Sequence, residues 1–314
     1  MKCLVSGATG FVGRHLCRQL LAQGDSVTAL SLSGSPLADG TPTVALDLAA
    51  ADPDAALMQG VDAVFHLAGI AHQRADTDAY RKLNTLATLR LAHLAAAQGV
   101  RCFVFLSSVK AMGPADTRDR RSENDCSPPR DAYGRSKWEA ECALREEFSG
   151  AAMSIVIVRP ALVYGPGAKG NLSRLARAVQ WGMPRPPEEG AHSMLALQDL
   201  ADLLCTIAAH PPPGVQTWIA CDDRGYSTRY LYDLLRRASG KGRGRAWLPR
   251  WAWRLAAALL DLAAGQRDTS TFDKLFGTEL YSSAAVSTAM NWRPRVTLDE
   301  VVSNLVASGG RGQL

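Results

Sequence analysis

The feature that most restricts the fold is a glycine-rich turn, GATGFVG at residues 7–13, which follows the apolar run CLVS and precedes an amphipathic pattern. This order predicts a buried strand over residues 2–6 and a helix over residues 11–21. Gly7, Gly10 and Gly13 can provide a tight turn, a close backbone approach to a ligand, and close packing of the helix on its strand. The N-terminus of such a helix favours a phosphate group. A turn in which glycine only relieves strain is the alternative, and the motif alone does not decide between the two.

The first half of the chain alternates strand patterns with helix patterns. Predicted strands cover residues 2–6, 26–31, 43–46, 63–67, 101–107 and 154–158. They are rich in valine, leucine and phenylalanine without strict polar alternation, as parallel strands buried on both faces are. The pattern predicts an α/β fold with a doubly wound parallel sheet over residues 1–160. Residues 161–314, where the alternation fades, are predicted to form mainly a smaller substrate-binding lobe, with some segments returning to the sheet.

The composition is that of an ordinary globular protein, with 47% apolar and 21% charged residues in 314. The net charge is +5 and no block of like charges appears, so no nucleic-acid partner is expected. The seven cysteines form no C-x-x-C pair and the histidines have no metal-like spacing, so we expect reduced thiols and no metal. Neither an apolar leader nor a run of about 18 apolar residues is present. We therefore expect a cytoplasmic protein.

One segment resembles a membrane-active helix. Residues 247–265, WLPRWAWRLAAALLDLAAG, repeat apolar side chains at helical spacing and place three tryptophans beside arginines. Such a helix can lie in a membrane interface. We favour the alternative that it packs on its own domain or on a neighbouring subunit.

A second motif carries chemistry. Tyr133 and Lys137 are four residues apart, so they share one face of a predicted helix. A phenol titrates near pH 10, and a nearby ammonium group lowers that value and makes the tyrosine a usable acid or base. Ser107 and Ser108 end a predicted strand about 25 residues earlier, where ligands of doubly wound sheets bind. The glycine-rich turn, the serine pair and the Tyr133–Lys137 motif together point to a catalytic crevice at one edge of the sheet.

At this point the chain resembles a known family, the extended short-chain dehydrogenase/reductases that modify nucleotide sugars. The matching stretches are GATGFVGRHL, VFHLAG, FLSSVKAMG, YGRSK and RPALVYGPG, in family order over about half of the chain. The resemblance implies that Tyr133 is the catalytic acid/base and that Lys137 lowers its pKa while it holds the nicotinamide ribose. Ser108 would hydrogen-bond the reacting oxygen, and Asn171 would touch the sugar-nucleotide phosphates. The remaining cofactor contacts that it implies are Phe11, Val12, Asp47, Leu48, Leu67, Ala68, Gly69, Asn84 and Ser107.

The same resemblance implies the reaction. We expect an NAD(P)-dependent enzyme that reduces the C4 keto group of a UDP-4-keto-6-deoxy-N-acetylhexosamine for surface-polysaccharide synthesis. The alternative is a UDP-hexose 4-epimerase, and a non-catalytic NAD(P)-sensing protein is a third hypothesis. A dehydratase would carry an acid/base pair after Ser108, where this chain has Val109 and Lys110. Relatives of this kind commonly pair as homodimers, and we predict the same here.

Three departures from the family pattern bear on the ligands. Ser31 stands at the strand end where NAD-preferring members carry an acid, and Arg14 can approach a 2′-phosphate, so we lean to NADP(H). His192 stands where relatives often have an arginine for the substrate diphosphate. The stretch ELYSSAAV, residues 279–286, replaces a segment that usually bears an aspartate.

Overall fold

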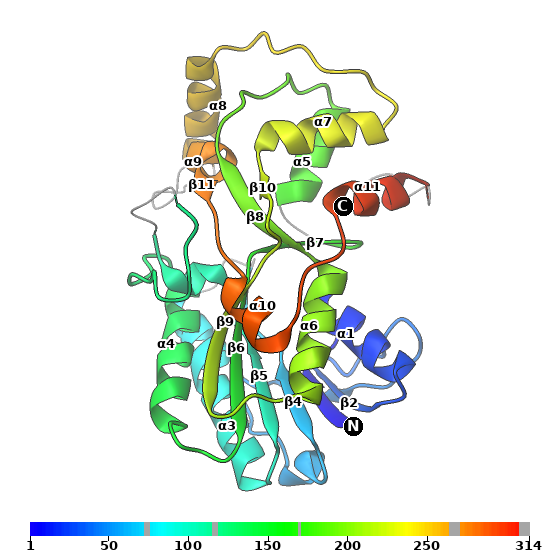
Figure 1. The fold of residues 1–314 in the computed structure, drawn as a ribbon, viewed down its shortest axis with the longest axis vertical. Coiled ribbons are helices and arrows are strands. Elements are labelled where there is room, and N and C mark those ends of the chain that lie inside the picture. The colour runs from blue at the N-terminus through cyan, green and yellow to red at the C-terminus, as the bar shows by residue number, and fades with distance from the viewer. Residues whose placement is uncertain (72–75, 115–118, 169–170, 264–270, 308–314) are drawn as a thin grey trace.

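The computed structural model of the chain describes residues 1–71, 76–114, 119–168, 171–263 and 271–307, without the side chains of residues 171, 173, 263 and 304–307. Its larger layer is a seven-stranded sheet in which every neighbouring pair is parallel, in the order β3-β2-β1-β4-β5-β6-β9 (Figure 1). The strands are β1 (Lys2–Ser6), β2 (Ser26–Ser31), β3 (Val44–Ala45), β4 (Ala63–His66), β5 (Cys102–Leu106), β6 (Ser154–Pro160) and β9 (Val215–Ala220). The doubly wound parallel sheet predicted from the sequence is confirmed.

Helices cover both faces of this sheet. On one face α1 (Phe11–Ala22) packs beside α6 (Leu197–Ala209), with α10 (Ala284–Met290) against β9. On the other face lie the 3-10 turn η1 (Ala55–Met58), α3 (Ala87–Ala97) and α4 (Ala132–Glu147). Strand side chains alternate between the two cores. Cys3 and Val5 of β1 pack with α1 and α6, whereas Leu4 packs with α3 and α4.

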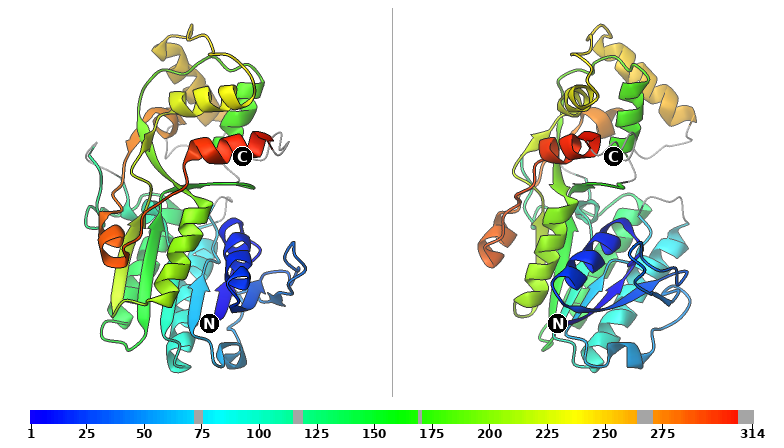
Figure 2. Two further views of the ribbon diagram at one scale, coloured as in Figure 1. Left: turned by 45° about the vertical axis from the view of Figure 1, so that its right-hand side comes forward. Right: turned by 90° about the vertical axis from the view of Figure 1, so that its right-hand side faces the viewer.

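The second lobe lies beyond the carboxyl ends of the strands (Figures 1 and 2). Its small sheet is built on β8 (Ala191–Ala196), which pairs with β7 (Leu162–Tyr164), β10 (Gly225–Tyr226) and β11 (Thr278–Glu279). The lobe also contains the helices α5 (Asn171–Gln180), α7 (Thr228–Ala238), α8 (Arg250–Ala263) and α9 (Thr271–Phe276). The terminal helix α11 (Leu298–Ala307) packs on α7. A substrate bound at the carboxyl edge of the large sheet would lie next to this lobe.

The helical spacing of apolar residues in DAYRKLNTLATLRLAHLAAAQG, residues 78–99, predicts one continuous helix, but the helix in the structure is interrupted. It begins as α2 (Thr77–Tyr80), continues as a π-helical stretch η2 (Arg81–Leu86), and becomes regular in α3. Asn84 within η2 turns its amide to the backbone of Ile70, accepting from its N–H at 2.9 Å and donating to its carbonyl at 3.1 Å. Its amide also donates to Ser136 Oγ of α4 at 3.0 Å. These three long-range bonds, which periodicity cannot reveal, accompany the change of helix type.

Candidate active site

The glycine-rich turn lies at the carboxyl end of β1, and its glycines are required by contact. Gly7 has φ +70°, and a Cβ at this position would lie 2.7 Å from the Ala68 backbone nitrogen. A Cβ on Gly13 would lie 2.2 Å from the carbonyl oxygen of Gly7. Gly10 caps α1 and offers no side chain to the free N–H groups of Phe11, Val12 and their neighbours. Backbone donors at this helix N-terminus are thus available for a phosphate group.

The loop after β4 forms the adjacent wall. A Cβ on Gly69 would lie 2.9 Å from Asn84 Oδ1 and 3.2 Å from Lys137 Nζ, so glycine alone fits there without displacing either group. Leu67 and Ala68 are half-buried beside the turn at Gly7. Asn84 is completely buried, and its three bonds tie the Gly69 loop to α4. Asn84 is therefore placed to position this wall and the helix that carries Tyr133.

Tyr133 and Ser108 meet where η3 (Val109–Met112) begins after β5. Ser108 is the N-cap of η3, and its hydroxyl accepts the Lys110 N–H at 3.2 Å and hydrogen-bonds Tyr133. Tyr133 occupies the first turn of α4, whose N-cap Asp131 accepts from Gly134 N–H at 2.8 Å. Burial raises the pKa of Tyr133 to about 12, although the bond to Ser108 opposes that change. The phenol is protonated at neutral pH.

Lys137 lies one turn further along α4 and is buried. Its ammonium group donates to the Leu106 carbonyl at 2.9 Å and lies 4.5 Å from the centre of the Phe105 ring. Burial lowers the pKa of Lys137 to about 7, while the Glu141 carboxylate works in the opposite direction. The protein alone thus keeps the tyrosine pKa high. The lowering of the tyrosine pKa expected from the Tyr133–Lys137 spacing is not found in this structure, because burial raises that pKa and outweighs the groups that oppose it.

A buried ion pair below Lys137 was not anticipated from the sequence. Glu141 is fully buried and binds the equally buried Arg159 of β6 through Nε at 3.0 and 3.1 Å and through Nη2 at 2.5 Å. The Ser107 hydroxyl donates to the same carboxylate at 2.5 Å, so it faces this network. Tyr133, Lys137 and Glu141 follow at four-residue spacing. That spacing was the available sequence signal for placing Glu141 on the same face of the helix.

The end of β2 lacks a carboxylate, as the sequence indicates. The buried hydroxyl of Ser31 bonds Thr43 Oγ1 at 2.7 Å and accepts from the Gly34 N–H at 2.9 Å. Arg14 is exposed in the first turns of α1. The carboxylate of Asp47 caps its own turn by accepting the Ala49 N–H at 2.9 Å, and Leu48 is buried beside it. We call Ser31, Arg14, Asp47 and Leu48 the cofactor rim. Its position at the end of β2, Ser31, carries no negative charge.

Comparisons with known proteins match this geometry. The model of the NAD dependent epimerase/dehydratase family matches residues 3–215. The chain is 31% identical over 313 residues to UDP-glucose 4-epimerase of Vibrio cholerae, covering 95% of this chain and 92% of that protein. The chain belongs to the NAD dependent epimerase/dehydratase family. The assignment to the extended short-chain dehydrogenase/reductases and the prediction of an enzyme are confirmed.

Two further comparisons mark the range within this family. A dTDP-6-deoxy-L-talose 4-dehydrogenase (NAD(P)(+)) of Kitasatospora kifunensis is 31% identical over 255 residues, covering 75% of this chain and 78% of that protein. Among solved structures, MoeE5 in complex with UDP-glucose and NAD superposes with a TM-score of 0.77, at 24% identity and with 99% of both chains covered. The latter shows a shared fold. The relatives thus include nucleotide-sugar enzymes that epimerise and enzymes that oxidise or reduce.

In this family member, Lys110 near Ser108 forms a charged pair that the sequence did not predict. Lys110, two residues after Ser108, forms an ion pair with Glu279 of β11, with both carboxylate oxygens 3.0 Å from Nζ. His192 of β8 pairs in register with Glu279. Burial lowers the pKa of His192 and the Lys110 charge adds to this, against the pull of Glu279. His192 is thus neutral at pH 7, and its buried Nε2 has no partner among the described residues. Asn171 begins α5, and its side chain lies outside the described residues.

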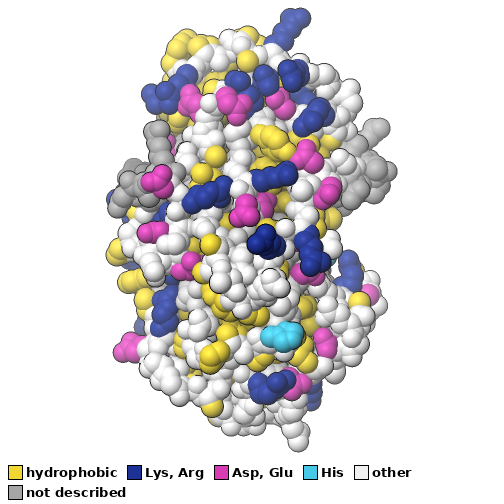
Figure 3. All heavy atoms as spheres, viewed as in Figure 1, with side chains coloured by type: hydrophobic (Ala, Val, Ile, Leu, Met, Phe, Trp, Pro, Cys, Tyr) yellow, Lys and Arg dark blue, Asp and Glu magenta, His cyan; other side chains and the backbone are white. Residues whose placement is uncertain are grey.

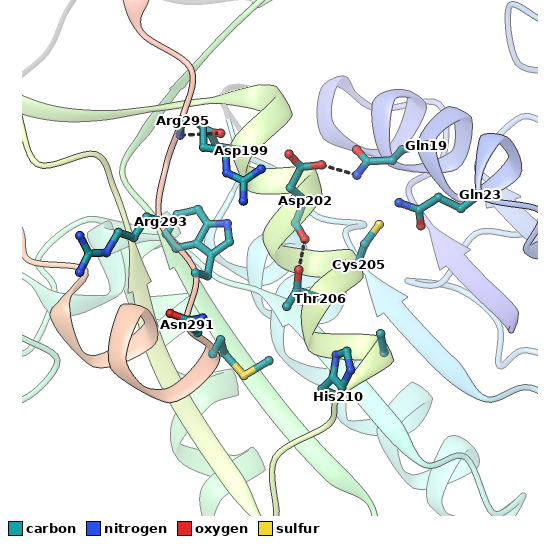
Figure 4. Close-up of a pocket in the computed structure, with 13 residues that line it drawn as sticks. Gln19, Gln23, Asp199, Asp202, Cys205, Thr206, His210, Asn291, Arg293 and Arg295 are labelled. Atoms are coloured by element: carbon teal, nitrogen blue, oxygen red, sulfur yellow. Dashed lines mark hydrogen bonds between the residues drawn. The ribbon is translucent and has the colours of Figure 1, made fainter.

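A separate pocket of about 430 Å³ lies on the outer side of α1 and α6 (Figure 4). None of the residues predicted for the active site lines it. Asp202 accepts from Gln19 at 2.5 Å, and Asp199 accepts from the backbone N–H groups of Arg295 and Val296 at 3.0 Å each. Asp199 thus holds the segment between α10 and α11 against α6. In the described part of the chain, no group of three or more His, Cys, Asp or Glu residues could hold a metal ion.

Proposed function

We propose that this enzyme reduces the C4 keto group of a UDP-linked 4-keto-6-deoxy-N-acetylhexosamine with a nicotinamide cofactor. The observation that carries the proposal is the hydrogen-bonded Ser108–Tyr133 pair with Lys137 behind it, at the carboxyl edge of the sheet. The Tyr133 phenol is protonated at neutral pH and can donate to the carbonyl oxygen, as ketone reduction requires, and its pKa of about 12 makes it a weaker acid than a free phenol. The protonated resting form of Tyr133 therefore supports reduction.

The residues present fit a dinucleotide. Gly7, Gly13 and Gly69 leave spaces that any Cβ would close, and the α1 N-terminus offers unpaired N–H groups toward a pyrophosphate. A nicotinamide cofactor supplies the hydride for this chemistry. Because Ser31 brings no carboxylate to the end of β2, we favour NADP(H) over NAD(H). In this proposal the residues that hold the cofactor are those of the glycine turn, the Leu67–Gly69 loop, Ser31 and Arg14, with Lys137 on the ribose.

The roles of the protein groups follow from their positions. Ser108 holds the carbonyl oxygen of the sugar, and Tyr133 delivers the proton to that oxygen. Lys137, with a pKa lowered to about 7, is near half-protonation and can return a proton to the phenolate. Val109 and Lys110 stand where a dehydratase would carry its acid/base pair, and Lys110 forms an ion pair with Glu279, so we do not propose removal of water from the sugar.

The second candidate is a UDP-hexose 4-epimerase, and one observation favours it. The Vibrio cholerae relative, matched over 95% of this chain, carries that name. The same three residues would then serve both oxidation and reduction at C4. Soluble UDP-sugars and a homodimeric assembly are proposed for both candidates.

The test is consumption of NADPH or NADH, followed by absorbance, with the UDP-4-keto-6-deoxy-N-acetylhexosamine. Steady oxidation is expected, and Tyr133→Phe should reduce its rate roughly 10²- to 10⁴-fold. Tyr80→Phe is the matched control, because the Tyr80 ring lies 6.3 Å from the Tyr133 ring and outside the Ser108–Tyr133–Lys137 set. Interconversion of UDP-hexoses without net oxidation would instead establish the epimerase. Unchanged turnover in Tyr133→Phe would refute the catalytic assignment.

A further inference from the structure

Helix α8 exposes a continuous apolar face. Trp251, Leu255, Leu259 and Leu262 follow at spacings of four, four and three residues, so they lie on one side of the helix. Their exposed fractions are 69%, 54%, 58% and 79%. Trp247, three residues before the helix begins, is 69% exposed. We call these five residues the α8 face.

The opposite side of α8 satisfies its own packing. Trp253 and Ala257 are buried, and the Trp253 ring packs edge-on against Phe276 of α9, 5.8 Å between centroids. Asp261 accepts from the Thr271 backbone N–H at 3.0 Å. One side of α8 thus packs on its own domain, which is one of the two arrangements that the sequence favoured. The α8 face is left to solvent, which is unusual for four large apolar side chains in a row.

The chain segment that leads into the α8 face is basic, although Arg250 at the start of α8 pairs with Glu189 at 2.9 Å and Arg237 pairs with Asp299. Between Asp233 and Asp261 the chain has no acidic residue and seven basic ones: Arg236, Arg237, Lys241, Arg243, Arg245, Arg250 and Arg254. Arg243 and Arg245 are exposed and form no ion pair with any residue that the structure describes. Figure 3 shows several Lys and Arg side chains over the end of the molecule where α7 and the segment before α8 lie, with Asp and Glu side chains between them.

We propose that the α8 face docks on the surface of a lipid bilayer that contains anionic phospholipids. Tryptophan and leucine side chains are the ones that partition into the interface between headgroups and acyl chains, and a basic border attracts anionic headgroups. Among the described residues no helix is long and apolar enough to cross a membrane, so the helix lies along the surface. This proposal is independent of which reaction the active site performs.

A second copy of the chain fits the α8 face less well. A twofold interface brings the same surface of two subunits together, so the basic border of one copy would face the basic border of the other. Like charges brought together in this way oppose association. An anionic surface instead attracts each of these basic side chains, so the charge favours binding. The sign of the charge thus selects the lipid surface as the occupant.

The test measures flotation of the full-length enzyme with vesicles. We compare vesicles of phosphatidylcholine alone with vesicles that also contain phosphatidylglycerol, and we expect binding to the second kind that weakens at high salt. The double variant Leu255→Ser/Leu259→Ser should lose at least about tenfold in binding, because it removes two inserting side chains. Arg243→Gln/Arg245→Gln should lose about fivefold per charge. Leu21→Ser, an exposed leucine on α1 in the other lobe, is the matched control and should bind as the unaltered enzyme does.

Each variant is first checked for unchanged turnover with a soluble substrate, which shows that it is folded. Equal binding by the Leu255→Ser/Leu259→Ser variant and the unaltered enzyme would overturn the proposal, as would absence of vesicle binding by the unaltered enzyme. The proposal would also fail if the double variant converted a dimer to a monomer in light scattering while no vesicle bound. That result would identify the α8 face as a subunit contact.

Discussion

Replacing Glu141 by glutamine tests the buried network under the active site. Glu141→Gln keeps the shape of the side chain and removes its charge. Arg159 is 2% exposed and then loses its only carboxylate among the described residues, while Ser107 and Arg145 lose a charged partner. The variant thus leaves a buried guanidinium without a counter-charge.

The expected cost follows from that burial. Breaking a buried ion pair by removing one partner lowers the free energy of unfolding by about 3–5 kcal/mol. Since whole proteins are stable by about 5–15 kcal/mol, this is a large fraction of the total. Arg145→Gln is the matched control. Its side chain is 37% exposed and it binds the same carboxylate at 2.9 Å, so its loss should cost less than about 1 kcal/mol.

The assay is urea unfolding of the cofactor-free enzyme, followed by tryptophan fluorescence. A third variant, Glu141→Leu/Arg159→Met, removes both charges and should be more stable than Glu141→Gln, because no uncompensated charge then remains buried. The reasoning is refuted if Glu141→Gln costs no more than Arg145→Gln. It is equally refuted if removal of both charges is worse than removal of one.

Two further predictions concern the cofactor rim and the active-site lysine. Arg14→Ala should weaken NADPH binding at least about tenfold and leave NADH binding nearly unchanged, because it removes a charge-assisted bond to a phosphate, whereas Arg18→Ala, one turn later on α1, should change neither. Fluorescence titration with both nucleotides checks this, and equal losses for the two would contradict the NADP(H) preference. Burial lowers the pKa of Lys137 to about 7, so between that value and its ordinary value the unfolded chain binds a proton that the folded chain does not. Cofactor-free wild type should therefore gain stability relative to Lys137→Met as the pH rises from 7 to about 10. A difference in urea midpoint that does not vary with pH would exclude this titration.

Local patterns were enough for much of the fold. The strands at Lys2–Ser6 and Ser26–Ser31 and the start of α1 at Phe11 lie where the apolar runs and the glycine turn predict them. Helix α3 ends at Ala97, and Gly99 follows with φ +73°, as a helix-ending glycine does. Periodicity and glycine geometry act over a few residues, so one sequence reveals them.

The family could also be recognised from the sequence, because Tyr133, Lys137 and Ser108 stand in motifs whose order along the chain is specific. Their assignment as site residues remains a prediction that turnover of the variants will test. The preference for NADP(H), the reductase reaction and the homodimer also remain predictions.

What the sequence determined by itself was therefore the order of strands and helices, the glycine cradle and the Tyr133–Lys137 spacing, all set by backbone geometry over short stretches. The tertiary structure decided the rest. It joined Lys110 to Glu279 across 169 residues, buried Glu141 against Arg159, and turned Asn84 to the Gly69 loop. It also raised the pKa of Tyr133 by burial and left one side of α8 uncovered. Burial and long-range pairing depend on which surfaces meet in space, and no local pattern of residues encodes that.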